Sequence, residues 1–175
     1  GLRLDPEGNL WVLDKPAGLQ VEADRFGNPS LQVEVQVYFQ KAFPWKKQLI
    51  VGIVHRLDRP VSGVVLIAKT PMALKEVNRQ FEMRQVRKIY LAVVEGTLAE
   101  KESELVHWLK KDLENKRSVV GKADGKETKE CRLKYRVLNE KSGKTLVEIE
   151  LLTGRYHQIR AQFSALGNPI FGDEI

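Results

Sequence analysis

The sequence is poor in the residues that hold metals and disulfides. It contains one cysteine, Cys131, and three histidines among its 175 residues. A single cysteine excludes an internal disulfide and is typical of a reducing compartment, so we expect a cytoplasmic location. The histidines are scattered and no Cys-rich cluster accompanies them. The sequence therefore predicts no metal site.

Long apolar runs are also lacking. No stretch approaches the roughly 20 apolar residues that a helix needs to cross a bilayer, so we expect no membrane partner. Hydrophobic residues make up 42% of the chain and charged residues 30%, which is typical of a globular domain with a real core. We expect one domain over residues 1–175 and a monomer.

Positive charge is in excess and is concentrated in one segment. The formal net charge is +6, and residues 110–136 contain ten Lys or Arg against five Asp or Glu. Phosphate contacts supply most of the sequence-independent affinity for nucleic acids, so a localised basic excess favours a polyanionic partner. A solvated lysine-rich hairpin without a partner explains the same charge, and charge alone does not decide between the two.

Periodicity predicts an α+β fold. Apolar and alternating runs indicate strands over residues 10–13, 49–54, 64–68, 88–94, 131–138 and 145–152. Strands outnumber helices and do not alternate with them, which favours a mixed, mainly antiparallel sheet with flanking helices. The polar residues 115–130 are expected to form a flexible loop or the tip of a long hairpin.

Helix starts are indicated at three places. Asn28-Pro29 has the pattern of a cap followed by the first helical position, although the alternating valines of 33–37 leave a strand open. Thr70-Pro71 is a clearer start. The last helix follows residues 153–154 and ends at Gly167. Its inward-facing side chains are expected to be Ile159, Phe163 and Leu166.

The most informative stretch is residues 55–63, His-Arg-Leu-Asp-Arg-Pro-Val-Ser-Gly, which we call the aspartate loop. It connects two apolar runs that are predicted strands. Charge beside a core is costly unless something pairs or uses it, so such a connection usually serves a site. A local ion pair or turn cap is the structural alternative. A second cluster, residues 153–160 (Thr-Gly-Arg-Tyr-His-Gln-Ile-Arg), follows another apolar strand and is called the Thr-Gly-Arg segment.

These clusters, with two others, resemble the catalytic domain of the RluA-type RNA pseudouridine synthases. The further segments are residues 14–18 (Asp-Lys-Pro-Ala-Gly) and 87–90 (Arg-Lys-Ile-Tyr), and the run 167–173 is similar as well. Each segment alone could arise by chance, whereas four in this order form a specific pattern. The resemblance implies the fold of that domain. It also implies an enzyme that converts uridine within RNA to its carbon-linked isomer without a cofactor.

The resemblance implies three catalytic residues. Asp58 would be the catalytic aspartate, since an ionised carboxylate can trap positive character on the ribose or remove a proton from it. Arg160 would be the cation that keeps this carboxylate charged. Tyr90 would hold the flipped uracil, and an ordinary core aromatic is its structural alternative.

The resemblance also implies contacts with RNA. Arg56 would fill the gap left by the flipped nucleotide, because its planar head can stack on bases and donate hydrogen bonds. His55 is expected to order the loop rather than touch RNA. Lys15 would contact phosphate or merely cover the strand end, and capping by Thr153 explains part of the Thr-Gly-Arg segment. The remaining RNA-binding candidates are Arg59, Lys88, Arg155 and His157.

The chain departs from the family pattern in places. Gln162 stands where a histidine is common, which alters a hydrogen bond beneath the site. Val61 replaces the usual threonine. The family normally continues beyond the position of Ile175, so we expect trimmed ends. No segment resembles the small S4-type RNA-binding domain that some relatives carry.

The sequence thus predicts a pseudouridine synthase for structured ribosomal or transfer RNA. The alternative is an RNA-binding module that has kept the fold and lost catalysis, which the intact set of Asp58, Tyr90 and Arg160 argues against. A glycoside hydrolase would need two carboxylates, and neither main segment contains a second one. The sequence leaves open whether Asp58 attacks the sugar, attacks the base or removes a sugar proton.

Overall fold

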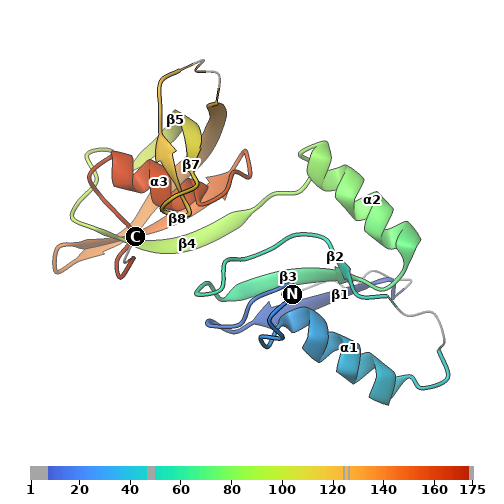
Figure 1. Cartoon of the computed structure of the whole chain (residues 1–175). Helices are drawn as coiled ribbons and strands as arrows, with labels where there is room; N and C mark the ends of the chain where they lie inside the picture. The colour runs from blue at the N-terminus through green and yellow to red at the C-terminus, as the bar shows by residue number, and fades with distance from the viewer. Residues whose placement is uncertain (1–7, 47–49, 124, 126, 174–175) are drawn as a thin grey trace. The chain divides into compact units, whose positions relative to one another are not determined.

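The chain forms two compact units, Gly1–Gln85 and Val86–Ile175. The computed structural model describes residues 8–46, 50–123, 125 and 127–173. The expectation of one catalytic domain stays a prediction. In both units the strands pair in antiparallel fashion and helices flank the sheets, which confirms the expected α+β class (Figure 1).

The described part of unit 1 contains a three-stranded sheet of order β1-β3-β2 and two helices. Its elements are β1 (Leu10–Lys15), α1 (Leu31–Ala42), β2 (Gly52–Ile53), β3 (Gly63–Ala68) and α2 (Pro71–Glu82). The register places Lys15 opposite Gly63, at the end of the sheet where the aspartate loop enters β3.

Helix α1 begins later than the sequence pattern suggested. Its cap is Ser30, whose Oγ accepts the Val33 N–H at 3.3 Å. Asn28 is not the cap, because its side chain and backbone N–H instead bond to Asp24 in the preceding turn. The strand left open over residues 33–37 is wrong. The helix packs on the sheet through Phe39, whose ring meets Trp11 edge to face at 4.3 Å.

Strand β2 is much shorter than the predicted run 49–54, of which residue 49 lies outside the described residues. It runs close to its neighbours at Gly52, where an added Cβ would lie 3.1 Å from that of Ala68 and 3.2 Å from Leu74 Cδ1. A larger residue here would press on both neighbours, which favours glycine at this close approach. Helix α2 starts as predicted, with Thr70 Oγ1 accepting the Ala73 N–H at 3.2 Å.

Unit 2 contains, in its described residues, a five-stranded sheet of order β4-β8-β7-β5-β6 and the helix α3. The elements are β4 (Ile89–Glu95), β5 (Glu102–Asp112), β6 (Arg117–Val120), β7 (Lys129–Lys141), β8 (Lys144–Leu151) and α3 (Gln158–Ala165). The sequence pattern did not predict β5, and β6 lies inside the run 115–130 expected to be a loop or hairpin tip. Alternation of Leu105, His107 and Leu109 was the available signal for β5.

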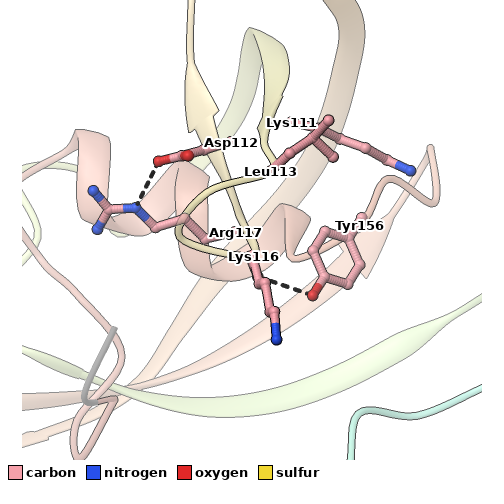
Figure 2. Close-up of a pocket in the computed structure, with 6 residues that line it drawn as sticks. All are labelled: Lys111, Asp112, Leu113, Lys116, Arg117 and Tyr156. Carbon is pink, nitrogen blue, oxygen red and sulfur yellow. Dashed lines mark hydrogen bonds and ion pairs between the residues drawn. The ribbon is translucent and has the colours of Figure 1, made fainter.

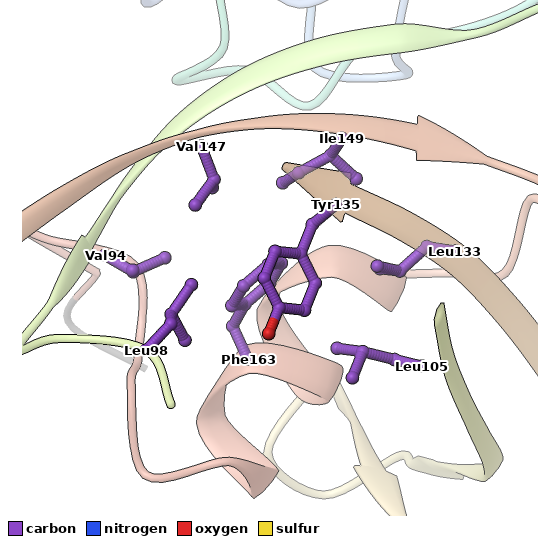
Figure 3. Close-up of a cluster of buried hydrophobic side chains, with 8 residues drawn as sticks. All are labelled: Val94, Leu98, Leu105, Leu133, Tyr135, Val147, Ile149 and Phe163. Carbon is purple, nitrogen blue, oxygen red and sulfur yellow. The ribbon is translucent and has the colours of Figure 1, made fainter. Parts of the chain in front are cut away.

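The core of unit 2 is a cluster of buried side chains between the sheet and α3 (Figure 3). Phe163 of α3 is completely buried and meets Tyr135 edge to face at 5.6 Å. The cluster comprises Val94, Leu98, Leu105, Leu133, Tyr135, Val147, Ile149 and Phe163. Leu166, predicted to face inward, is 39% exposed because α3 ends at Ala165. That prediction is wrong, whereas the inward position of Phe163 is confirmed.

Replacing Phe163 with alanine should destabilise unit 2 by about 3–5 kcal/mol, because the change removes a ring from the centre of the core. Hydrogen exchange measured by mass spectrometry on peptides from β7 and β8 would report this loss. Leu166→Ala, at the residue that follows α3, is the matched control, and we expect it to change exchange little. A loss below about 1 kcal/mol for Phe163→Ala would contradict the assignment of the core.

Candidate active site

In unit 1 the fold brings residues 14–18 against the aspartate loop. The Gly18 N–H donates to the Arg59 carbonyl at 2.8 Å, and Arg59 Nε donates back to the Gly18 carbonyl at 3.0 Å. Gly18 has a φ of +86°, which glycine adopts without strain. Two segments separated by about forty residues of sequence are therefore hydrogen-bonded to one another in the fold. The sequence pattern identified each segment but not this contact.

Lys15 fastens these two segments from inside. Its side chain is completely buried, and its ammonium donates to the carbonyls of Pro16 at 3.0 Å, Leu19 at 2.6 Å and Arg59 at 3.3 Å. Burial lowers the pKa of Lys15, and the negative charge of Asp58 opposes that shift. The expected contact between Lys15 and RNA phosphate does not fit this position, because three carbonyls already occupy its donors.

Asp58 lies at the surface of unit 1, at a turn closed by the Val61 N–H donating to the Asp58 carbonyl at 3.0 Å. Leu57 beside it is buried and anchors the loop. The backbone of Asp58 is thus held between a buried side chain and a tight turn, and the residue is exposed. The buried Lys15 interacts electrostatically with Asp58. The sequence pattern did not predict this neighbour.

The other ionisable side chains of the aspartate loop divide between surface and interior. Arg56 is exposed and pairs with Glu22 at 2.8 Å, and Arg59 is exposed as well. His55 turns inward, where its Nε2 accepts the Leu66 N–H at 3.1 Å and its ring stacks on Phe81 at 5.3 Å. These contacts agree with the expected role of His55 in ordering the loop.

In unit 2 the fold brings residues 87–90 beside the Thr-Gly-Arg segment. Strands β4 and β8 pair so that the Leu151 N–H donates to the Lys88 carbonyl at 2.9 Å. The Lys88 ammonium lies next to Gly154, 3.2 Å from where a Cβ would stand. Tyr90 is partly buried and packs against the core cluster.

A network of buried amides supports the Thr-Gly-Arg segment. The Thr153 hydroxyl accepts the Arg132 N–H at 2.9 Å and bonds to Gln158 Oε1 at 2.8 Å. Gln158 Nε2 donates to Gln162 Oε1 at 2.9 Å, and Gln162 Nε2 lies 3.1 Å from His107 Nδ1. Thr153 therefore does not cap α3, since His157 occupies the cap position and the hydroxyl is used within the network.

Arg160 leaves this segment toward Asp173. Its Nε donates to Asp173 Oδ2 at 2.7 Å and its Nη2 to Asp173 Oδ1, a two-point ion pair that is largely buried. Its Nη1 lies 3.2 Å from Nδ1 of His157. Sequence reasoning missed Asp173 as a partner of this guanidinium. Arg155 is exposed, with its Nε donating to the Glu130 carbonyl at 3.1 Å.

The predicted site residues thus form two groups, one on each unit. Unit 1 carries Lys15, Arg56, Asp58 and Arg59, and unit 2 carries Lys88, Tyr90, Arg155, His157 and Arg160. The ion pair between Asp58 and Arg160 would join the two groups, and it stays a prediction. Among the described residues no group of His, Cys, Asp or Glu side chains is arranged to hold a metal ion.

The segments that the fold gathers are matched by a known family. The family model described as RNA pseudouridylate synthase matches residues 9–165, which covers both groups of site residues. The chain belongs to the RluA-type RNA pseudouridylate synthase family. A dual-specificity RNA pseudouridine synthase of Yersinia pestis is 35% identical over 94% of this chain and 76% of its own length.

Other members share less of their length with this chain. The ribosomal large subunit pseudouridine synthase D of Nitrosomonas europaea is 34% identical over 97% of this chain and 47% of its own. A solved human structure, RNA pseudouridylate synthase domain containing 4, has a TM-score of 0.81 at 23% identity and shows the same fold over 97% of this chain and 66% of its own. The chain spans about half the length of several other curated relatives that it matches.

None of the helices in the described residues is long and apolar enough to span a membrane.

The network under the Thr-Gly-Arg segment should make stability depend on pH. Burial lowers the pKa of His107 below its ordinary value of 6.5. Below pH 6.5 the unfolded chain binds a proton that the folded chain resists, so stability falls until the folded pKa is reached. Urea denaturation between about pH 7.5 and 5.5 would measure this slope.

His107→Gln is the matched variant for that experiment, because it keeps an acceptor for Gln162 and cannot be protonated. We expect the variant to lose less stability than the parent chain over the same range. Equal slopes for the two proteins would contradict the role assigned to His107.

Proposed function

We propose that this chain isomerises uridine to pseudouridine within structured ribosomal or transfer RNA, with Asp58 as the catalytic aspartate. The observation that carries this proposal is the construction of the aspartate loop. Asp58 is an exposed residue of unit 1, while Lys15 and Leu57 hold the loop from inside. A preorganised carboxylate is what cleavage of a bond to an anomeric carbon requires.

The reaction breaks the bond between C1′ of the ribose and N1 of uracil and forms a bond between C1′ and C5. The proton at C5 is released to solvent and N1 gains a proton, so no oxidant or reductant is consumed. Asp58 can assist by attacking the sugar, attacking the base or removing a sugar proton. Arg160 would stabilise the charged carboxylate, and Tyr90 would hold the detached uracil.

The target uridine must leave its stack before Asp58 can reach it, at a cost of a few kcal/mol. Arg56 is suited to fill the gap. Its partner Glu22 sits at the surface, and exposed ion pairs contribute only about 0–1 kcal/mol, so RNA can replace that pairing easily. The names of the Yersinia and Nitrosomonas relatives support RNA, and ribosomal RNA in particular, as the substrate class.

Asp58→Asn should slow the release of tritium from RNA labelled at C5 of uridine by at least about a hundredfold, because the amide cannot act as base or nucleophile. Total RNA from cells lacking this protein is the substrate. Glu82→Gln, an exposed carboxylate at the end of α2, is the matched control and should release tritium normally. Binding without release in the unaltered protein would instead indicate the RNA-binding module.

Asp173 is proposed to position Arg160 for this reaction through its two-point ion pair. Asp173→Asn keeps the shape and loses the charge, so we expect a roughly tenfold slower single-turnover release of tritium, about 1.4 kcal/mol. RNA affinity should stay unchanged, and Asp173→Glu should recover part of the rate. Equal rates for the parent chain and Asp173→Asn would remove this role.

A further inference from the structure

A small hollow lies at the end of the β5–β6 hairpin, in unit 2, where none of the predicted site residues stands (Figure 2). Its volume is about 220 Å³, and it is open to solvent on one side. The lining residues are Lys111, Asp112, Leu113, Lys116, Arg117 and Tyr156. Five of them belong to the hairpin, and Tyr156 belongs to the Thr-Gly-Arg segment. We call this surface the hairpin platform.

The turn of the platform is fixed by its own hydrogen bonds. The Asp112 carboxylate accepts the Asn115 backbone N–H at 3.1 Å and its side-chain Nδ2 at 2.8 Å. These bonds hold the pKa of Asp112 below its ordinary value, so the carboxylate stays charged and the turn stays closed near neutral pH. The backbone of this turn is therefore held by the protein's own hydrogen bonds.

Tyr156 is tied to the hairpin at two points. Its hydroxyl donates to the Lys116 carbonyl at 2.9 Å (Figure 2). Its own carbonyl accepts from the Ser118 hydroxyl at 2.6 Å. Its ring stacks on His157 with centroids 3.7 Å apart. One face of the ring is thus occupied, and the rest of it stands at the edge of the hollow.

The chemistry of the platform combines exposed apolar surface with positive charge. Leu113 is 82% exposed and Tyr156 is 45% exposed. The Lys111 ammonium lies 5.9 Å from the centroid of the Tyr156 ring. Arg117 pairs with Asp112 at 3.5 Å, whereas no ion pair links Lys111 or Lys116 to any described side chain. An aromatic ring beside cations of this kind is the arrangement by which proteins hold unpaired nucleotides.

We propose that the hairpin platform binds one unpaired nucleotide of the RNA substrate, outside the uridine that reacts. The base rests on the exposed parts of Tyr156 and Leu113, and Lys111 and Lys116 contact the adjoining phosphates. This proposal rests on the proposed function for the identity of the RNA. It also gives a role to the basic excess over residues 110–136, for which a solvated hairpin was the other explanation.

Fluorescence anisotropy with a labelled single-stranded oligouridylate, at several salt concentrations, tests the platform. Tyr156→Leu and Leu113→Ser should each weaken binding, the former by about tenfold, since base–aromatic stacking contributes on the order of 1–3 kcal/mol. The double variant Lys111→Gln, Lys116→Gln should reduce the salt dependence by about two phosphate contacts. Tyr156→Phe keeps the ring and loses the bond to the Lys116 carbonyl, so it should bind more tightly than Tyr156→Leu.

Matched controls lie on the same unit. Leu138→Ser removes an exposed apolar side chain of β7, and Lys141→Gln removes an exposed cation at the end of that strand. Both should bind the oligouridylate like the parent chain. Leu113 and Lys116 lie in the exposed turn and Lys111 is an exposed residue near the end of β5, so their variants keep the test decisive even if Tyr156→Leu folds poorly.

Two outcomes separate this proposal from the proposed function. If the parent chain releases tritium and the platform variants bind like their controls, the platform is overturned and the enzyme stands. If the platform variants bind tenfold more weakly and the parent chain releases no tritium, the enzyme is overturned and the platform stands.

Discussion

The construction of unit 1 depends on one buried ammonium ion. Lys15 reaches three backbone carbonyls that belong to two segments, and its three hydrogens match three acceptors. A buried charge without such partners would cost several kcal/mol, so the carbonyls must stay where they are. The aspartate loop is consequently held from its inner side, which fixes the backbone next to the exposed Asp58.

In unit 2 the corresponding segment is held in place by neutral side chains instead of a buried charge. The Thr-Gly-Arg segment lies over side-chain amides, with Gln158 and Gln162 bonded to one another and to neighbouring backbone. Buried polar networks are costly when half satisfied and rigid when complete. The rigidity fixes the start of α3, from which Arg160 extends to Asp173. A charged anchor and a neutral anchor thus position the two groups of residues that the proposed reaction requires.

Much of the fold was predictable because the local signals were strong. Thr70 and Pro71 start α2 as their pattern indicates, and alternation identified β7 and β8. The errors have physical causes. Asn28 looked like a cap, but Asp24 captures its side chain, and β5 was overlooked because charged residues interrupt its apolar alternation. Leu166 was predicted to face inward because it continues the helical period of Phe163, but the helix ends one residue before it.

The segments that carry the candidate site could be identified from the sequence, whereas the contacts within them could not. Polar clusters after apolar runs, together with the family resemblance, indicated the segments around Asp58 and Arg160. The contacts of Lys15 and Asp173 depend on tertiary packing that no local pattern encodes. Lys15 also shows how residue type misleads. A lysine at the end of a strand is typically a surface cation. Here it is a buried residue whose three ammonium hydrogens are all donated to carbonyls. Arginine, often taken as its mild substitute, carries five donors on a flat, bulkier head. Exchange of one basic residue for the other at this position would therefore disrupt the interior rather than preserve a charge.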